Sequence, residues 1–406
     1  MLRRSIQVLH VQIPALASDT TKEMSCVCFA CSKNLSLIAP YLRKSTRNRR
    51  DFRAFHKKFH LISRHIAKTL GEAMIRTPYL LFLGDAPDQL AAKVAQGIAD
   101  WNPDSVVGQY RMQGCQADVG APDMSLQEAY DKGARTLVVG VANRGGVISD
   151  AWIEVLAEAM EIGFDLASGL HSLLRDEDVL KATSTRSGAT LHDVRVPTVA
   201  YPIANGKKRT GKRCLALGTD CSVGKMYTAL AMDGEMQKRG LKSSFRATGQ
   251  TGILVTGRGV PLDAVIADFM AGAVEWLTPD NDPDHWDHIE GQGSLFHVSF
   301  SGVTMALIHG GQPDAIILAH EPTRTHMRGL PDYDLPSLEA LRDLALPIAK
   351  IANPDVVIAG VSVNTKALGD EEAARLCEEI EGRLGLPTVD PYRHGAGRLV
   401  DALVAL

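Results

Sequence analysis

The chain has 406 residues, 45% of them hydrophobic and 22% charged, which is the composition of an ordinary globular protein with room for two domains. No apolar run is as long as a membrane span, and the seven cysteines form no disulfide framework, so a reducing cytoplasm is the expected location. The formal net charge is −3, although residues 1–76 carry 15 Lys and Arg against 4 Asp and Glu. The rest of the chain is therefore acidic, which argues against nucleic acid as a partner.

Residues 1–73 do not share the pattern of the rest of the chain. A basic run at residues 43–58 lacks a clean apolar period and fits a transit peptide or a nucleic-acid arm. The regular pattern that starts at Met74 favours translation from that methionine instead. Three nearby cysteines could suggest zinc, but no fourth ligand follows at a familiar spacing; they are Cys26, Cys28 and Cys31. We expect this basic extension to be absent from the native protein or disordered.

From residue 74 to 205, short apolar runs alternate with amphipathic ones. Strands are expected at residues 79–84, 105–110, 136–142, 165–168 and 191–196, and helices at 88–99, 125–132 and 149–162. This alternation predicts a Rossmann-like domain with a mainly parallel sheet and flanking helices. Ligands bind at the carboxyl ends of such strands, where the glycine-containing loops 143–146 and 169–171 serve as ligand loops or as simple turns.

Residues 196–213 are rich in proline, glycine and basic residues, and the strand–helix alternation then restarts. Strands are expected at 215–218, 244–247, 286–289, 315–319, 356–363 and 388–389, and helices at 261–276, 303–309, 338–349, 370–384 and 395–404. We therefore predict a second α/β domain over residues 206–406, again with a mainly parallel sheet.

The second domain begins with a phosphate-loop pattern, LALGTDCSVGKMYTAL at residues 215–230. A buried strand, a turn bounded by Gly218 and Gly224, the cation of Lys225 and a helix N-terminus are what an anion requires. The spacing between the glycines is one residue longer than usual, as in the dethiobiotin synthetase group, which the loop resembles. Met226 stands where a hydroxyl would hold Mg²⁺. The residues expected to contact the phosphate are Gly218, Thr219, Asp220, Cys221, Ser222, Val223, Gly224, Lys225 and Met226.

Three further stretches follow strands of the same sheet. Glu290 resembles the magnesium ligand of dethiobiotin synthetase, so Mg²⁺ is a possible cofactor, although a surface turn also fits. Asn364 resembles that group's adenine-contacting residue, and a local cap explains it equally well. Arg246 and Gln250 are polar candidates for substrate binding near this edge.

The stretch HEPTRTHMRG at residues 320–329 is the densest polar group in the chain. It follows a buried strand, where binding residues concentrate, although a solvated loop would look similar. Arg324 and Arg328 could bind carboxylates in a bidentate manner. The candidates for a general base are His320, Glu321 and His326.

From Met74 onward the chain resembles the D-glutamate N-acetyltransferase (DgcN) family. The matching stretches are GDAPDQLAAKVAQGI, GVANRGGVIS, GTDCSVGKMYTALA, FRATGQTGIL, DPDHWDHIEGQGSLFH and HEPTRTHMRGLP. The resemblance implies a Rossmann-like domain joined to a P-loop domain. It also implies acetyl transfer from acetyl-CoA to the amino group of D-glutamate, in D-amino acid catabolism. Small molecules are then the partners, and we expect a homo-oligomer.

A P-loop without its magnesium hydroxyl could hold the phosphates of CoA without cleaving them. The stretch at residues 320–329 would then supply the base and the cations, and backbone N–H groups at residues 291–294 an oxyanion partner. Two alternatives remain. One is an ATP- and Mg²⁺-dependent kinase or ligase, and the other a nucleotide-binding regulator without turnover.

The basic extension gives a first testable prediction. The intact mass of the natively expressed protein should fall below the 43.8 kDa of the full chain, because translation from Met74 would omit the preceding residues. A native mass equal to that of the full chain would contradict the later start and leave disorder as the remaining expectation.

Overall fold

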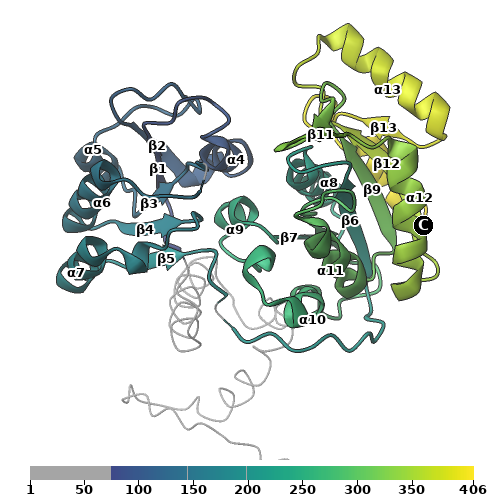
Figure 1. The fold of residues 1–406 in the computed structure, drawn as a ribbon, viewed down its shortest axis with the longest axis horizontal. Coiled ribbons are helices and arrows are strands. Elements are labelled where there is room, and N and C mark those ends of the chain that lie inside the picture. The colour runs from purple at the N-terminus through teal and green to yellow at the C-terminus, as the bar shows by residue number, and fades with distance from the viewer. Residues whose placement is uncertain (1–74, 144, 198) are drawn as a thin grey trace, which may run out of the picture. The chain divides into compact units, whose positions relative to one another are not determined.

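The structure is a computed structural model that describes residues 75–143, 145–197 and 199–406 (Figure 1). The predictions made for residues 1–73, including the group of Cys26, Cys28 and Cys31, lie outside these residues. Within the described part of the chain, no helix combines the length and the apolar content that a membrane crossing requires.

The first sheet has central strands that are buried on both faces, as expected of parallel strands. Its five strands are all parallel and lie in the order β2-β1-β3-β4-β5. They are β1 (Tyr79–Gly84), β2 (Val106–Arg111), β3 (Thr136–Val139), β4 (Asp165–Ser168) and β5 (Leu191–Asp193). The helices between them are α4 (Lys93–Trp101), α5 (Leu126–Asp131), α6 (Asp150–Ile162) and α7 (Asp178–Ser187). Helix α4 lies on one face, and the other three lie along the opposite face (Figure 1).

The second sheet has six strands, all parallel, in the order β13-β12-β9-β6-β8-β7. They are β6 (Lys212–Gly218), β7 (Ser243–Arg246), β8 (Trp286–Ile289), β9 (Ala315–His320), β12 (Val357–Val363) and β13 (Thr388–Val389). Strands β6 and β9 occupy the middle, so the loops that follow them meet at the centre of one sheet edge. The prediction of two mainly parallel sheets with flanking helices is confirmed.

Helices cover both faces of the second sheet and bury an apolar core on each. The helices of this domain are α8 (Lys225–Lys238), α9 (Gln250–Thr256), α10 (Ala267–Leu277), α11 (Ser301–Gly311), α12 (Leu338–Ala352), α13 (Asp370–Leu384) and α14 (Gly397–Val404), of which α9 packs instead against the core of the first sheet. Helices α10, α11 and α12 contribute to one core and α8 and α14 to the other (Figure 1).

Several elements differ from the sequence prediction. Helix α4 begins at Lys93 rather than at residue 88, because the side chain of Asp88 accepts from the N–H of Ala91 and stabilises a turn there. The helix expected at 261–276 is divided into a 3₁₀ turn, Leu262–Ala264, and α10. Helix α7 was missed altogether, because its exposed residues have little apolar periodicity.

The polar stretch after β9 is not a plain loop. It enters a two-stranded antiparallel hairpin, β10 (His326–Met327) and β11 (Leu330–Asp334), which turns at Gly329 with a φ of 78°. The side chains of this stretch are therefore fixed in part by strand pairing.

The core of the first sheet continues into the second part of the molecule. Buried residues of α8, β7 and α9, among them Leu230, Phe245 and Leu254, belong to the same apolar cluster as the first sheet. A Cβ added at Gly97 of α4 would lie 2.7 Å from Thr251 Cγ2 of α9, so the two helices pack closely there. The phenol of Tyr227 on α8 also donates to Asp100 of α4. The α4 helix is thus held directly against the P-loop domain.

Candidate active site

The loop between β6 and α8 lies at the centre of the candidate site. It has the expected order of buried strand, turn and helix, with α8 beginning at Lys225. Ser222 and Gly224 both take the left-handed conformation, with φ values of 55° and 101°. A left-handed conformation at these two positions lets neighbouring backbone N–H groups point into one concavity that favours anions. The geometry of a phosphate-binding loop is therefore present.

Lys225 is buried beneath this loop. Its ammonium donates to the backbone carbonyl of Asp220 over 2.7 Å, and burial lowers its pKa to about 8. A Cβ at Gly218 would lie 2.9 Å from Lys225 Nζ, so only glycine leaves room for the side chain. The lysine is placed to add charge to the loop.

Asp220 connects the loop to the stretch after β9. Its fully buried carboxylate accepts from Arg324 Nη1 and from the backbone N–H of Arg328, each over 2.7 Å through Oδ2. Arg324 also donates to the backbone carbonyls of Cys221 and Ser222, over 2.8 and 3.2 Å, and pairs with Glu321. The guanidinium of Arg324, which the sequence predicted to bind a carboxylate of the substrate, is instead hydrogen-bonded to groups of the protein.

The three candidate bases have different surroundings. His320 ends β9, and its Nδ1 lies 3.0 Å from Thr219 Oγ1 of the loop; burial lowers its pKa to about 4. Glu321 accepts from Thr323 and Arg324 within its own turn. His326 is exposed on β10. The structure therefore brings His320, but not His326, to the loop.

Glu290 follows β8 and is buried. Its Oε2 accepts from the backbone N–H groups of Thr248 and Gly249, over 2.8 and 3.0 Å, at the start of α9. Burial raises its pKa to about 7. The carboxylate thus fixes the two residues that lead into α9, a helix that the sequence did not indicate.

This arrangement does not fit a magnesium site of the usual P-loop kind. Such a site requires a hydroxyl beside the loop lysine and a free carboxylate. Met226 occupies the hydroxyl position and packs against the core of the first sheet, and one carboxylate oxygen of Glu290 is bound by two N–H groups. We derive no step through magnesium.

The remaining candidates are held by neighbours. Asn364 Oδ1 accepts from the N–H of Lys366, a local turn, while its Cβ would lie 3.8 Å from a Cβ on Gly224 of the loop. Arg246 donates to the buried carboxylate of Asp287 over 2.8 Å.

Gln250 is the first residue of α9 rather than part of a loop. Its amide, oriented to satisfy its neighbours, donates to the carbonyl of Gly169 and accepts from Arg195. Gln250 therefore joins the P-loop domain to the first sheet.

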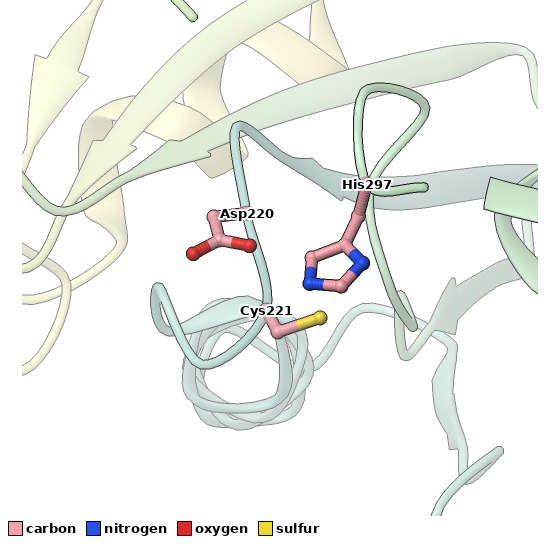
Figure 2. Close-up of side chains that lie close together, drawn as sticks. All are labelled: Asp220, Cys221 and His297. Atoms are coloured by element: carbon pink, nitrogen blue, oxygen red, sulfur yellow. The ribbon is translucent and has the colours of Figure 1, made fainter. Parts of the chain in front are cut away.

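Asp220, Cys221 and His297 form a compact group beside the loop (Figure 2). One possible ligand atom from each lies within 4.8 Å of the others, and Asp220 Oδ1 is buried without a hydrogen-bond partner. These are residue types that bind zinc. However, His297 Nδ1 accepts from the N–H of Ser299, which leaves the ring hydrogen on Nε2, 3.2 Å from the carbonyl of Arg328. That nitrogen is a donor in this arrangement, and cationic side chains surround the group, so we assign no metal to it.

A cavity of about 470 Å³ opens next to this group. Its lining comprises Lys93, Cys221, Ser222, His297, Ser299, Phe300, Arg328, Gly329 and Leu330. Burial raises the pKa of the Cys221 thiol, although Lys225, Arg328 and Arg324 oppose this rise. Lys93 and His297 were missed by the sequence analysis. Lys93 lies on a helix of the other domain, and no spacing in the sequence indicates that it reaches this loop.

Comparison with known proteins identifies the family. A D-glutamate N-acetyltransferase from Tritonibacter scottomollicae is 74% identical over 333 residues, which are 82% of this chain and 100% of that protein. This chain belongs to the D-glutamate N-acetyltransferase family. A second member, from a Pseudoalteromonas species, is 47% identical over 331 residues, 82% of this chain and 98% of that protein.

The domain comparisons agree with the two sheets. Residues 202–400 match the P-loop domain of the DUF1611 family, and residues 110–197 match its Rossmann-like domain. A crystal structure of a DUF1611 family protein from Anabaena variabilis superposes with a TM-score of 0.73 at 31% identity, covering 82% of this chain and 100% of that one. The D-glutamate N-acetyltransferase resemblance and the predicted fold class are confirmed.

The role of Arg324 can be tested by its loss. Arg324→Ala removes the ion pair of the buried Asp220 carboxylate, so the free energy of unfolding should fall by about 3 kcal/mol. Denaturant unfolding measures this change. Arg342→Ala, which removes a surface pair with Asp343, should change stability by at most about 0.5 kcal/mol. If Arg324→Ala leaves stability unchanged but weakens binding of the carboxylate substrate, Arg324 binds that substrate, as the sequence predicted.

Glu290 gives a pH-dependent prediction. Burial raises its pKa from the ordinary 4.5 to about 7, so between these values the folded protein binds more protons than the unfolded chain. This contribution to stability is present at low pH and is lost as the pH rises through about 7. Glu290→Gln lacks the titration, so its stability relative to wild type should increase from about pH 5 to about pH 8. Urea unfolding across this range measures the difference. The exposed Glu371→Gln is the control, and parallel curves for wild type and Glu290→Gln would contradict the prediction.

Proposed function

We propose that this protein transfers the acetyl group of acetyl-CoA to the amino group of D-glutamate. The observation that carries the proposal is the 74% identity with a full-length relative of that name. The name implies an acyl donor, and acetyl-CoA is the donor that suits a phosphate-binding loop. In the reaction, the neutral amine attacks the thioester carbonyl carbon, a C–N bond forms, the C–S bond breaks, and CoA leaves as a thiolate that takes up a proton.

The proposed roles follow the geometry of the loop. Backbone N–H groups from Asp220 to Gly224 and the ammonium of Lys225 would hold a phosphate of CoA, whereas the N–H of Thr219 donates to the carbonyl of Ala319 in the sheet. His320, neutral near pH 7 because burial lowers its pKa, is the candidate base that stands beside the loop. The backbone at residues 291–294 adjoins Lys225, since a Cβ at Gly291 would lie 2.8 Å from Lys225 Cδ, and this segment is the proposed oxyanion partner.

The competing activity is an ATP- and Mg²⁺-dependent kinase or ligase. The apolar packing of Met226 disfavours it, because the loop then has no hydroxyl for magnesium at that position, and one carboxylate oxygen of Glu290 already accepts from two backbone N–H groups. Homo-oligomeric assembly and a cytoplasmic location belong to the proposal as expectations.

The direct test combines acetyl-CoA with D-glutamate and measures release of free thiol. Thiol release that depends on D-glutamate is expected without ATP or Mg²⁺. A strict requirement for ATP and Mg²⁺, with no thiol release, would overturn the proposal and favour the kinase.

Lys225 and Met226 separate the two activities further. If the loop holds CoA, Lys225→Ala should raise the KM for acetyl-CoA by about tenfold and change kcat little, because the contact is the same in ground and transition states. In phosphoryl transfer, kcat would collapse instead. Lys238→Ala, at the exposed end of the same helix, is the matched control. Met226→Thr should leave acetyl transfer independent of Mg²⁺.

A further inference from the structure

Lys93 is a cation without a counter-ion in the cavity beside the loop. It is the first residue of α4, and among the described residues no carboxylate forms an ion pair or a hydrogen bond with its ammonium. The neighbouring charges that act on it most are those of Arg328 and Arg195, both positive. Arg195 forms an ion pair with Asp263, whereas Lys93 forms no ion pair with any carboxylate of the described residues. Positive charge therefore accumulates at this point of the cavity.

Arg328, at the turn between β10 and β11, lines the same cavity. Its guanidinium donates to the neutral hydroxyl of Ser222, and within the described chain it has no carboxylate partner. Two partly buried cations that face one cavity repel each other and lose hydration, which is unfavourable unless an anion binds between them. The cavity therefore has the charge of an anion-binding site.

The lining also limits the kind of anion. Phe300 and Leu330 add apolar surface, which suits a short hydrocarbon chain between two charged ends. The loop of residues 218–225 already offers its own N–H groups to a phosphate. A dicarboxylate has an anionic group at each end of a short hydrocarbon chain, which matches the two cations and the apolar lining of the cavity.

We propose that this cavity binds the two carboxylates of the acceptor amino acid through Lys93 and Arg328, and that Lys93 selects dicarboxylic over monocarboxylic acceptors. This inference rests on the proposed function. Lys93 comes from the first sheet's domain, so the acceptor site is complete only where α4 packs against the P-loop domain. Arg324, the other arginine of the hairpin stretch, is excluded because its donors are occupied.

A binding experiment tests the site without turnover. Glutarate, a dicarboxylate without an amine, is titrated calorimetrically into wild type, Lys93→Gln, Lys93→Arg and the control Lys132→Gln, which changes an exposed lysine after α5. Lys93→Gln should bind glutarate about tenfold more weakly or worse, and Lys93→Arg should recover part of the affinity. Acetyl-CoA and inorganic phosphate should bind all four proteins alike. Unchanged glutarate affinity in Lys93→Gln, or a selective loss of acetyl-CoA affinity, would overturn the inference and assign the cavity to the phosphates of CoA.

A kinetic experiment tests selectivity. The ratio of kcat/KM for D-glutamate to that for D-glutamine should fall about tenfold in Lys93→Gln, mainly through the KM for D-glutamate. An unchanged ratio would contradict the role of Lys93 while leaving acetyl transfer established. Absence of acetyl transfer in wild type, with glutarate binding still dependent on Lys93, would overturn the proposed function and keep the dicarboxylate site.

Discussion

The buried ion pair between Asp220 and Arg324 is the interaction on which the site depends. It joins the loop after β6 to the stretch after β9, the two central strands of the second sheet. A fully buried carboxylate is tolerated only when its charge is neutralised and hydrogen-bonded, and both donors come from one short stretch. The backbone N–H of Arg328 donates to the same carboxylate, so this interaction also fixes the place at which Arg328 lines the cavity.

The ion pair also explains which cations remain for ligands. Arg324 donates to one carboxylate and two backbone carbonyls of the loop, so its guanidinium stabilises the conformation of the loop. Arg328 contributes its backbone N–H to the same carboxylate and keeps its guanidinium at the cavity. Two arginines four residues apart thus have different surroundings, since the guanidinium of Arg324 is bonded to the loop and Arg328 lines the cavity.

The sequence predicted the architecture well, because buried parallel strands and the loops after them are local patterns. It also placed Asp220, His320 and the arginines at one sheet edge, since carboxyl ends of adjacent parallel strands meet there. It did not show how the charges pair, because pairing depends on side-chain directions across the edge. Helix α9 was missed since it is short and contains Gly252, and its start is stabilised by the distant Glu290. Lys93 could not be found for a similar reason: its contact with the site depends on domain packing.

Met226 links the chemistry of the loop to that packing. At the position where a hydroxyl would hold magnesium, its side chain reaches α4, where a Cβ added at Gly97 would lie 3.3 Å from its Cε. A polar residue there would lose this apolar contact, and α4 carries Lys93 at its first position. Met226 therefore affects both the chemistry of the loop and the packing of α4. It leaves no hydroxyl for a metal at that position of the loop, and it packs against the helix that carries Lys93, the cation proposed to bind a carboxylate.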